Sequence, residues 1–161
     1  MSTNIESKPL VIERVFDAPR EQVWKAWTEP ELAMQWWGPK GYTTPVCKID
    51  FRVGGKFLNC MRGPDGVDIW STGVYREIVE LERIVCTDSF ADEHGNVVPA
   101  TNYGMPEMPL EMMFTVTFED AGNGKTKLTI KHEGLPVGDM LSGANEGWNQ
   151  LFEKLAEYLA A

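Results

Sequence analysis

Hydrophobic residues near the end of the chain recur at helical spacing. Between Val137 and Ala161 they fall on one stripe, and the polar residues of the segment fall on the opposite side. The stripe consists of Met140, Leu141, Ala144, Trp148, Leu151, Phe152, Leu155 and Leu159. This pattern predicts a long amphipathic helix. Its first half contains Gly143 and Gly147, which disfavour helix, and this indicates close packing, a frayed first turn or space for a ligand beneath the helix.

Most of the preceding chain has the alternating pattern of short strands separated by turn residues. A first strand is expected over Pro9 to Phe16, followed by short helices over Arg20 to Thr28 and Glu31 to Trp36. Further strands are expected at 45–53, 56–62, 67–79, 83–90, 110–119 and 125–132. Residues 1–8 are polar and are expected to be disordered, and residues 9–161 are expected to form a single domain.

The order of these elements predicts the fold. Strands joined by tight turns are antiparallel, and one antiparallel sheet of this size twists and curls. Its concave face must be covered, and the C-terminal helix is the element that is long enough to cover it. The sequence therefore predicts an α+β fold in which a curved antiparallel sheet surrounds a long C-terminal helix.

Composition narrows the class of partner. The formal net charge is -9, with Lys+Arg 15 and Asp+Glu 24, so binding to nucleic acid or to an anionic membrane surface is not expected. No apolar segment is long enough to span a membrane, and no signal peptide is recognised, which predicts a cytoplasmic protein. The 3 cysteines are widely spaced and are expected to be free thiols. No metal-binding motif occurs, and no cofactor is expected.

Candidate site residues are those that the strand and helix patterns direct between sheet and helix. From the regular elements these are Phe57, Met61, Met112, Phe114, Trp148 and Phe152, which either fill a core or line an adaptable pocket. Tyr103 and Met105, in the long loop 91–109, either form a lid over its mouth or pin a surface loop through their own apolar contacts. His132 shares strand parity with Leu128 and Ile130, so its side chain should point toward the helix. It is then either a core histidine that is hydrogen-bonded by backbone or water, or a polar group that anchors a ligand.

Several short segments resemble a known family when taken in order and spacing. They are Trp36-Trp37-Gly38-Pro39, Asp50-Phe51-Arg52-Val53-Gly54-Gly55, Pro64-Asp65-Gly66, Gly73-Val74-Tyr75-Arg76-Glu77-Ile78, Glu82-Arg83-Ile84-Val85 and Gly147-Trp148. From about Leu10 onward, the chain resembles the branch of the START/Bet v 1-like (SRPBCC) superfamily related to the C-terminal domain of the activator of the Hsp90 ATPase. The resemblance implies the helix-grip fold and a deep apolar cavity. Members bind lipids, sterols, polyketides or phenolics, and some are cyclases or hydrolases.

Three hypotheses about function follow. The first is binding of a small hydrophobic or amphipathic molecule of lipid, polyketide or phenolic type, without chemistry, because no general acid–base pair is visible in the sequence. The second is an enzyme of the polyketide cyclase or hydrolase kind that uses His132 with a carboxylate or thiol. A short distance from His132 to Asp88 or to a cysteine would favour it. The third is a module that interacts with an Hsp90-type chaperone. The sequence shows no counterpart of the eukaryotic activator's N-terminal domain, which argues against this third hypothesis.

Overall fold

A seven-stranded antiparallel sheet forms the framework of the protein in a computed structural model that describes residues 8–160. Its order is β1-β7-β6-β5-β4-β3-β2. The strands are β1 (Leu10–Phe16), β2 (Thr43–Ile49), β3 (Lys56–Arg62), β4 (Asp68–Val79), β5 (Arg83–Ala91), β6 (Met112–Gly122) and β7 (Lys125–Glu133). From β2 to β7, each strand pairs with the next strand along the chain, and β1 pairs with β7 at the other edge of the sheet. Apart from Lys8, the expectation of disorder at residues 1–8 lies outside the described residues.

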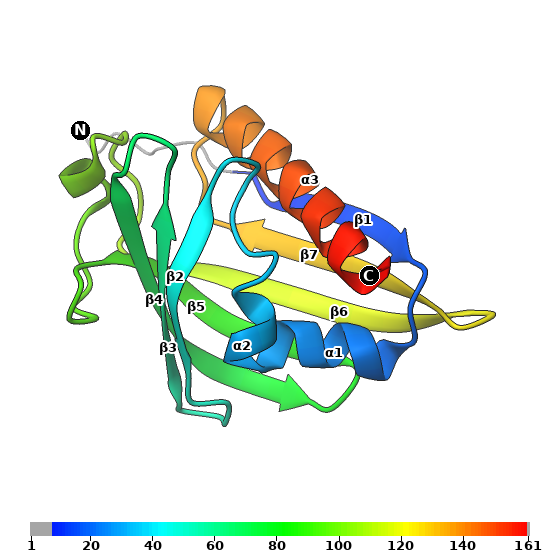
Figure 1. Ribbon diagram of the computed structural model, residues 1–161. Helices are drawn as coiled ribbons and strands as arrows, with labels where there is room; N and C mark the ends of the chain where they lie inside the picture. Colours follow the sequence, from blue (N-terminus) through cyan, green and yellow to red (C-terminus); the bar gives the residue numbers. More distant parts are fainter. Residues whose placement is uncertain (1–7, 161) are drawn as a thin grey trace.

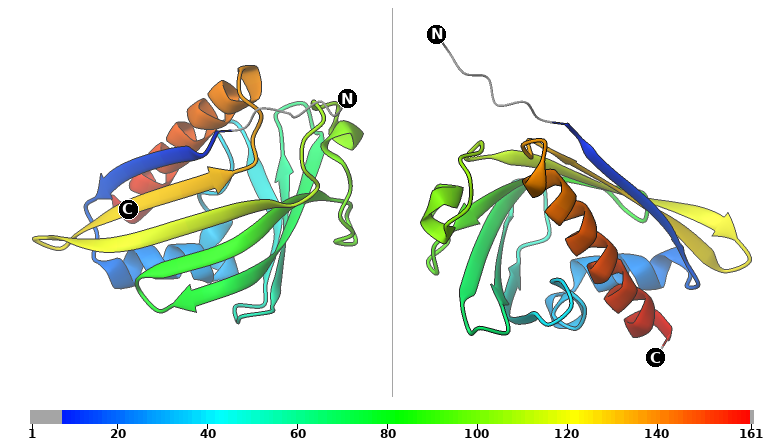
Figure 2. Two further views of the ribbon diagram at one scale, coloured as in Figure 1. Left: turned by 180° about the vertical axis from the view of Figure 1, so that it is seen from behind. Right: turned by 90° about the horizontal axis from the view of Figure 1, so that it is seen from above.

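The helices cover the concave side of this sheet. Helices α1 (Arg20–Thr28) and α2 (Pro30–Ala33) follow β1, and α3 (Asp139–Ala160) follows β7. Helix α3 lies across the hollow of the curved sheet (Figure 1). The view from above in Figure 2 shows β3 and β4 on one side of α3 and β1 and β7 on the other. The α+β helix-grip architecture predicted from the sequence is therefore confirmed.

Several element boundaries differ from the prediction by one to four residues, and backbone hydrogen bonds explain two of the differences. Helix α2 ends at Ala33 rather than Trp36, because the Trp36 amide bonds the carbonyl of Ala33, three residues back, and the chain tightens into a turn. Strand β2 ends at Ile49 rather than at residue 53. The Arg52 amide bonds the Asp50 carbonyl in a tight turn, and Val53 is 60% exposed instead of facing inward.

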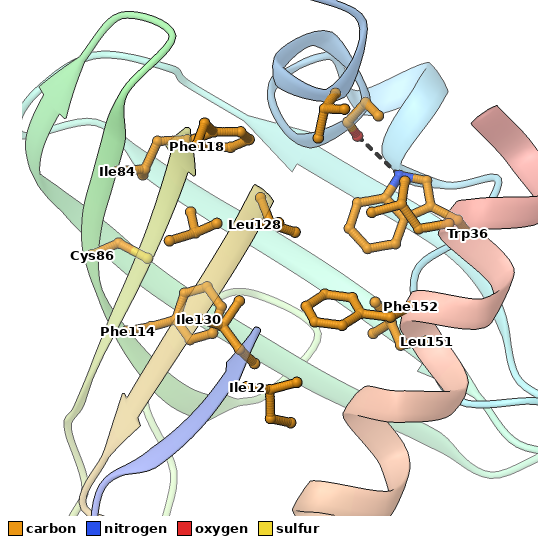
Figure 3. Packing of buried hydrophobic residues seen from close by; sticks show 14 of the residues in the cluster. Ile12, Trp36, Ile84, Cys86, Phe114, Phe118, Leu128, Ile130, Leu151 and Phe152 are labelled. Carbon is orange, nitrogen blue, oxygen red and sulfur yellow. Dashed lines mark hydrogen bonds between the residues drawn. The ribbon is translucent and has the colours of Figure 1, made fainter. Parts of the chain in front are cut away.

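The core lies between β6, β7 and the second half of α3. Alternate residues of β6 and β7 face the helix, and α3 buries Leu151, Phe152, Leu155 and Leu159 against them. Figure 3 shows Phe152 and Leu151 beside Phe114 and Ile130. The same view shows the fully buried Trp36, whose Nε1 donates to the Ala26 carbonyl at 3.0 Å. This packing fixes α3 from its middle to its C-terminal end.

Gly73 allows β4 to bend where it lies between β3 and β5. A Cβ at this position would lie 1.9 Å from the carbonyl oxygen of Thr87 and 2.4 Å from Cε1 of Phe57, so no other residue fits without movement. The Val74 amide donates to Oγ1 of Thr87 at 2.8 Å, and the register with β5 shifts between Tyr75 and Glu77. The sheet therefore curves here, and Phe57 is pressed over its concave face.

None of the helices within residues 8–160 is both long enough and apolar enough to cross a membrane.

Candidate ligand-binding site

A cavity of about 250 Å³ lies between the sheet and the first half of α3, and we call it the outer hollow. Met61, Asp88, Met112 and His132 line it from four different strands. On the helix side it is lined by Gly143, Ala144, Gly147, Trp148 and Leu151, and beside the helix by Trp37 and Pro39. The outer hollow is thus mainly apolar, with polar groups at its strand side.

The small residues of α3 create this space. The buried residues of α3 begin at Leu151, so its first ten or so positions do not pack tightly on the sheet. A Cβ on Gly143 would meet nothing within 4 Å, and one on Gly147 would only reach Cγ of Pro39 at 3.6 Å. Neither glycine is therefore required by close packing, and the explanations that stay open are a frayed first turn and space for a ligand beneath the helix.

A second cavity of about 80 Å³ adjoins the first, and we call it the inner hollow. It lies deeper, between α1, α2 and strands β2 to β6, and is lined by Trp27, Asn59, Cys86 and Phe114 among others. Trp37, Ser71, Asp88 and Trp148 line both hollows. The two cavities are therefore neighbouring parts of one hollowed interior.

His132 and Asp88 form the main polar feature of the outer hollow. Nε2 of His132 lies 3.0 Å from Oδ2 of Asp88, and the His132 residue is 7% exposed. Neither nitrogen of the imidazole has a hydrogen-bond partner within residues 8–160, so the carboxylate is close to Nε2 but out of line for a hydrogen bond. A buried imidazole without a partner is costly, and a ligand group that bonds it would remove that cost.

The backbone register explains how these two residues meet. His132 on β7 pairs with Phe114 on β6, and Asp88 on β5 pairs with Met112 on β6. All four side chains are on the concave face, so Asp88 and His132 approach each other diagonally across β6. The alternation of Ile84, Cys86 and Asp88, of which the first two are buried, was the signal in the sequence that could have placed Asp88 inside.

Three nearly parallel aromatic rings line the inner hollow, and one of them, Trp148, also lines the outer hollow. The ring of Trp148 is 5.2 Å from that of Phe114 with planes 14° apart, and 6.3 Å from that of Trp27 with planes 12° apart. The edge of His132 faces Phe114 at 5.8 Å and 76°. Parallel flat surfaces of this kind favour a planar apolar group lying against them.

The cysteine thiols are poorly suited to nucleophilic chemistry. Burial, and then the charge of Glu31, raise the pKa of Cys47 to about 11. Burial also raises the pKa of Cys86, with Asp88 adding to the effect, and raises the pKa of Cys60. Because the thiolate is the nucleophile, these neutral thiols do not supply one near neutral pH. Residues 8–160 also contain no cluster of three or more His, Cys, Asp or Glu side chains placed to bind a metal ion.

The structure places the predicted site residues in two groups. Phe57, Met61, Met112, Phe114, His132 and Trp148 each line one or both hollows. Phe152, Tyr103 and Met105 line neither. Phe152 is fully buried in the core, beside Phe16 at 5.6 Å. A role in ligand binding for the first group stays a prediction.

Tyr103 lines neither hollow and is held at the ends of two strands. Its hydroxyl donates to the Ala91 carbonyl and accepts from the Trp70 amide at 3.2 Å, and its ring packs on Phe90 at 5.7 Å. These contacts fasten the loop to the ends of β4 and β5. Sequence analysis did not identify Trp27, which becomes part of the site only through the placement of α1. It also missed Asn59, although this residue alternates with Phe57 and Met61 on β3, and it named Asp88 only as a possible partner of His132.

Lys154 fastens the loop beside the outer hollow to α3. Its Nζ donates to the carbonyls of Trp37, Gly38, Pro39 and Tyr42 at 3.0 to 3.4 Å. Burial lowers the pKa of this amine. Neighbouring contacts support the same loop. The Lys40 side chain pairs with Glu153, and the Lys40 backbone amide donates to Oε1 of Gln150 at 3.2 Å. The second half of α3 therefore holds the wall that Trp37 and Pro39 form.

Replacing Lys154 with methionine is expected to lower the free energy of unfolding by about 1–3 kcal/mol, because four carbonyl groups lose their shared donor. Urea denaturation would measure the loss, and amide hydrogen exchange would show faster exchange at residues 38–42. The matched control is Lys131→Met, which removes an exposed lysine paired with Glu133 at 3.6 Å. An equal loss in both variants would contradict the anchoring role of Lys154.

The curved sheet, the long C-terminal helix and the hollowed interior between them define a protein of the START/Bet v 1-like class. Within that class, the sequence profile described as activator of Hsp90 ATPase homolog 1-like protein matches residues 17–160. The chain belongs to this family. The resemblance stated from the sequence motifs is thereby confirmed.

Solved structures agree with this assignment. A Chromobacterium violaceum protein is 29% identical, with a TM-score of 0.76 and coverage of 95% of this chain and 97% of that chain. A Nitrosomonas europaea protein is 26% identical, with a TM-score of 0.76 and coverage of 94% of both chains. The AHSA1 protein of Silicibacter pomeroyi, at 22% identity, a TM-score of 0.75 and coverage of 95% and 98%, shows the fold alone. A comparison with functionally curated proteins gives no significant match.

Proposed function

We propose that this protein binds a small amphipathic molecule in the outer hollow. The apolar part lies between Met61, Met112 and Trp148, and a polar group reaches His132 and Asp88. The observation that carries the proposal is the buried imidazole of His132, which lines a cavity of about 250 Å³ and has no hydrogen-bond partner in the described chain. Pockets for small molecules commonly combine apolar walls with a few polar groups of this kind.

The chemistry of the polar group follows from the charges around it. Asp88 disfavours an anion at this position, and His132 offers two ring nitrogens that can donate or accept. A neutral hydroxyl satisfies both residues, because it can donate to the carboxylate and bond the imidazole. The ligand is therefore expected to carry a hydroxyl on an apolar body.

Calorimetric titration with naphthalene and 2-naphthol tests this proposal. The hydroxyl of 2-naphthol is expected to increase affinity about tenfold over naphthalene, the value of one good hydrogen bond to a charged or buried partner. In His132→Leu the two probes should bind within about twofold of each other, since the polar anchor is gone. Leu128→Ile, a change in the core on the same strand, is the control. Binding of neither probe, or a hydroxyl preference that persists in His132→Leu, would overturn the proposal.

A second candidate function is proton transfer by the same pair. The 3.0 Å separation of His132 and Asp88 favours it, because a carboxylate beside an imidazole is an arrangement that general acid–base catalysis uses. The probe is 2-acetonaphthone in D₂O, whose methyl protons an active base would remove and replace with deuterium. Exchange above the buffer rate, lost in His132→Leu, would support catalysis, and exchange at the buffer rate would leave binding without chemistry.

Interaction with an Hsp90-type chaperone stays a hypothesis that rests on the family description. A pull-down with purified Hsp90 tests it, and the absence of binding would remove it.

A further inference from the structure

The inner hollow has unpartnered polar atoms of its own. Within residues 8–160, the fully buried side-chain nitrogens and oxygens that lack a hydrogen-bond partner are Nδ1 and Nε2 of His132, Oδ1 of Asn59 and Nε1 of Trp27. His132 belongs to the outer hollow, whereas Asn59 and Trp27 line the inner one. All of these atoms therefore belong to residues of the two hollows and none to the solid core.

Asn59 is held in place by the sheet. It lies in the middle of β3, paired with Cys47 on β2 and with Ser71 on β4, and it is 8% exposed. A buried asparagine on the concave face of a strand, where apolar residues are usual, needs a partner for its amide oxygen. The structure supplies space in front of it instead of a protein donor.

The two unpartnered atoms are complementary. Oδ1 of Asn59 accepts a hydrogen bond, and Nε1 of Trp27 donates one. A hydroxyl can both donate and accept, so it suits a hollow that offers an acceptor and a donor. A carboxylate or phosphate does not suit it, because Asp88 is the charged side chain in the lining and would repel an anion.

The position of Asn59 relative to His132 and Asp88 sets the distance expected between the two polar groups of a ligand. Asp88 on β5 and Asn59 on β3 are separated by two strand spacings, which is about 10 Å along the sheet. The nearly parallel rings of Phe114 and Trp148 line the same hollow as these two side chains. A rigid flat body with polar groups at opposite ends would match this arrangement.

We propose that the inner hollow is a second polar recognition point, at which Asn59 and Trp27 bind a hydroxyl at the far end of a planar aromatic ligand. This inference rests on the proposed function, because it places the near end of the same molecule at His132 and Asp88. Asn59 and Trp27 are then the residues that select a ligand with two hydroxyls over one with a single hydroxyl.

The test extends the titration series to 2,6-dihydroxynaphthalene, whose hydroxyls lie at opposite ends of the rings. The second hydroxyl is expected to raise affinity about tenfold over 2-naphthol in the unchanged protein. In Asn59→Leu the gain should fall below about twofold, whereas the preference for 2-naphthol over naphthalene should remain. The isomer 2,7-dihydroxynaphthalene is the matched control probe, because its second hydroxyl points in a different direction. Its affinity should exceed that of 2-naphthol by less than about twofold.

Tryptophan indole NMR signals provide a second measurement that does not depend on whether Asn59→Leu folds. The Trp27 Nε1–H signal, assigned with Trp27→Phe, should move downfield with 2,6-dihydroxynaphthalene and not with 2-naphthol. The signal of Trp36, whose Nε1–H already donates to Ala26, is the internal control and should not move. An unmoved Trp27 signal would mean that its N–H faces a neighbouring ring, such as that of Trp37 at 5.8 Å and 84°, and would overturn the inference.

The outcomes separate this inference from the proposed function. In one outcome, 2-naphthol binds through His132 but the second hydroxyl adds no affinity. In another, the affinity gained from the second hydroxyl persists in Asn59→Leu. Either result would mean that the inner hollow holds solvent, and would overturn the inference but not the proposed function. If none of the four probes binds, both are overturned. A tenfold gain that disappears in Asn59→Leu, together with the Trp27 shift, supports the assignment.

Discussion

Replacing Ala144 with phenylalanine is expected to weaken 2-naphthol binding by at least about a hundredfold, which corresponds to about 2.7 kcal/mol. Ala144 is half-buried on the face of α3 that lines the outer hollow. A phenylalanine ring at this position would occupy the space that the ligand is proposed to take. Calorimetric titration would measure the loss, with urea denaturation to show that the free energy of unfolding is maintained.

The control for this substitution is Ser142→Phe. Ser142 is exposed on the same turn of α3 and does not line the outer hollow, so a ring at this position should leave 2-naphthol affinity within about twofold. Equal affinities of Ala144→Phe and the unchanged protein would place the binding site away from α3, and would remove space for a ligand as an explanation of Gly143 and Gly147.

Replacing Phe152 with alanine is expected to lower the free energy of unfolding by about 3–5 kcal/mol. The Phe152 side chain is fully buried, packs edge-on against Phe16 at 5.6 Å, and lies at a tilt against Trp148 at 5.8 Å. The loss is large because total stabilities are commonly about 5–15 kcal/mol. Urea denaturation at constant pH would measure it.

Leu110→Ala provides the comparison for Phe152→Ala. Leu110 is 56% exposed, so its truncation should change the free energy of unfolding by about 0.5 kcal/mol or less. A loss below about 1 kcal/mol in Phe152→Ala would mean that the second half of α3 is not docked as the structure shows. The expected result assigns Phe152 to the scaffold and not to the ligand, which separates it from the other aromatic residues predicted for the site.

Lys154 and Phe152 show how one helix serves two purposes. Its second half packs into the core through Phe152 and fastens the loop 37–42 through Lys154. Its first half, with Gly143 and Ala144, covers the outer hollow without filling it. Ligand binding is therefore expected to be more sensitive to changes in the first half, and stability to changes in the second half.

The fold could be predicted because its signals are local. The helical stripe that ends at Leu159 and the alternation of β6 and β7 follow from the spacing of apolar residues, and turn residues such as Asn123 and Gly124 fix antiparallel neighbours. Boundaries were less well determined where backbone hydrogen bonds in a turn compete with the strand pattern, as they do after Ile49.

The sequence by itself determined the helix-grip architecture, the inward direction of His132 and the small-residue half of the last helix. Only the tertiary structure decided that Asp88 lies 3.0 Å from His132 and that Asn59 and Trp27 line a separate inner hollow. The reason is that these contacts join residues from different strands and helices. Their distances depend on the bend at Gly73 and on the position of α1, and no local spacing along the chain encodes either of them.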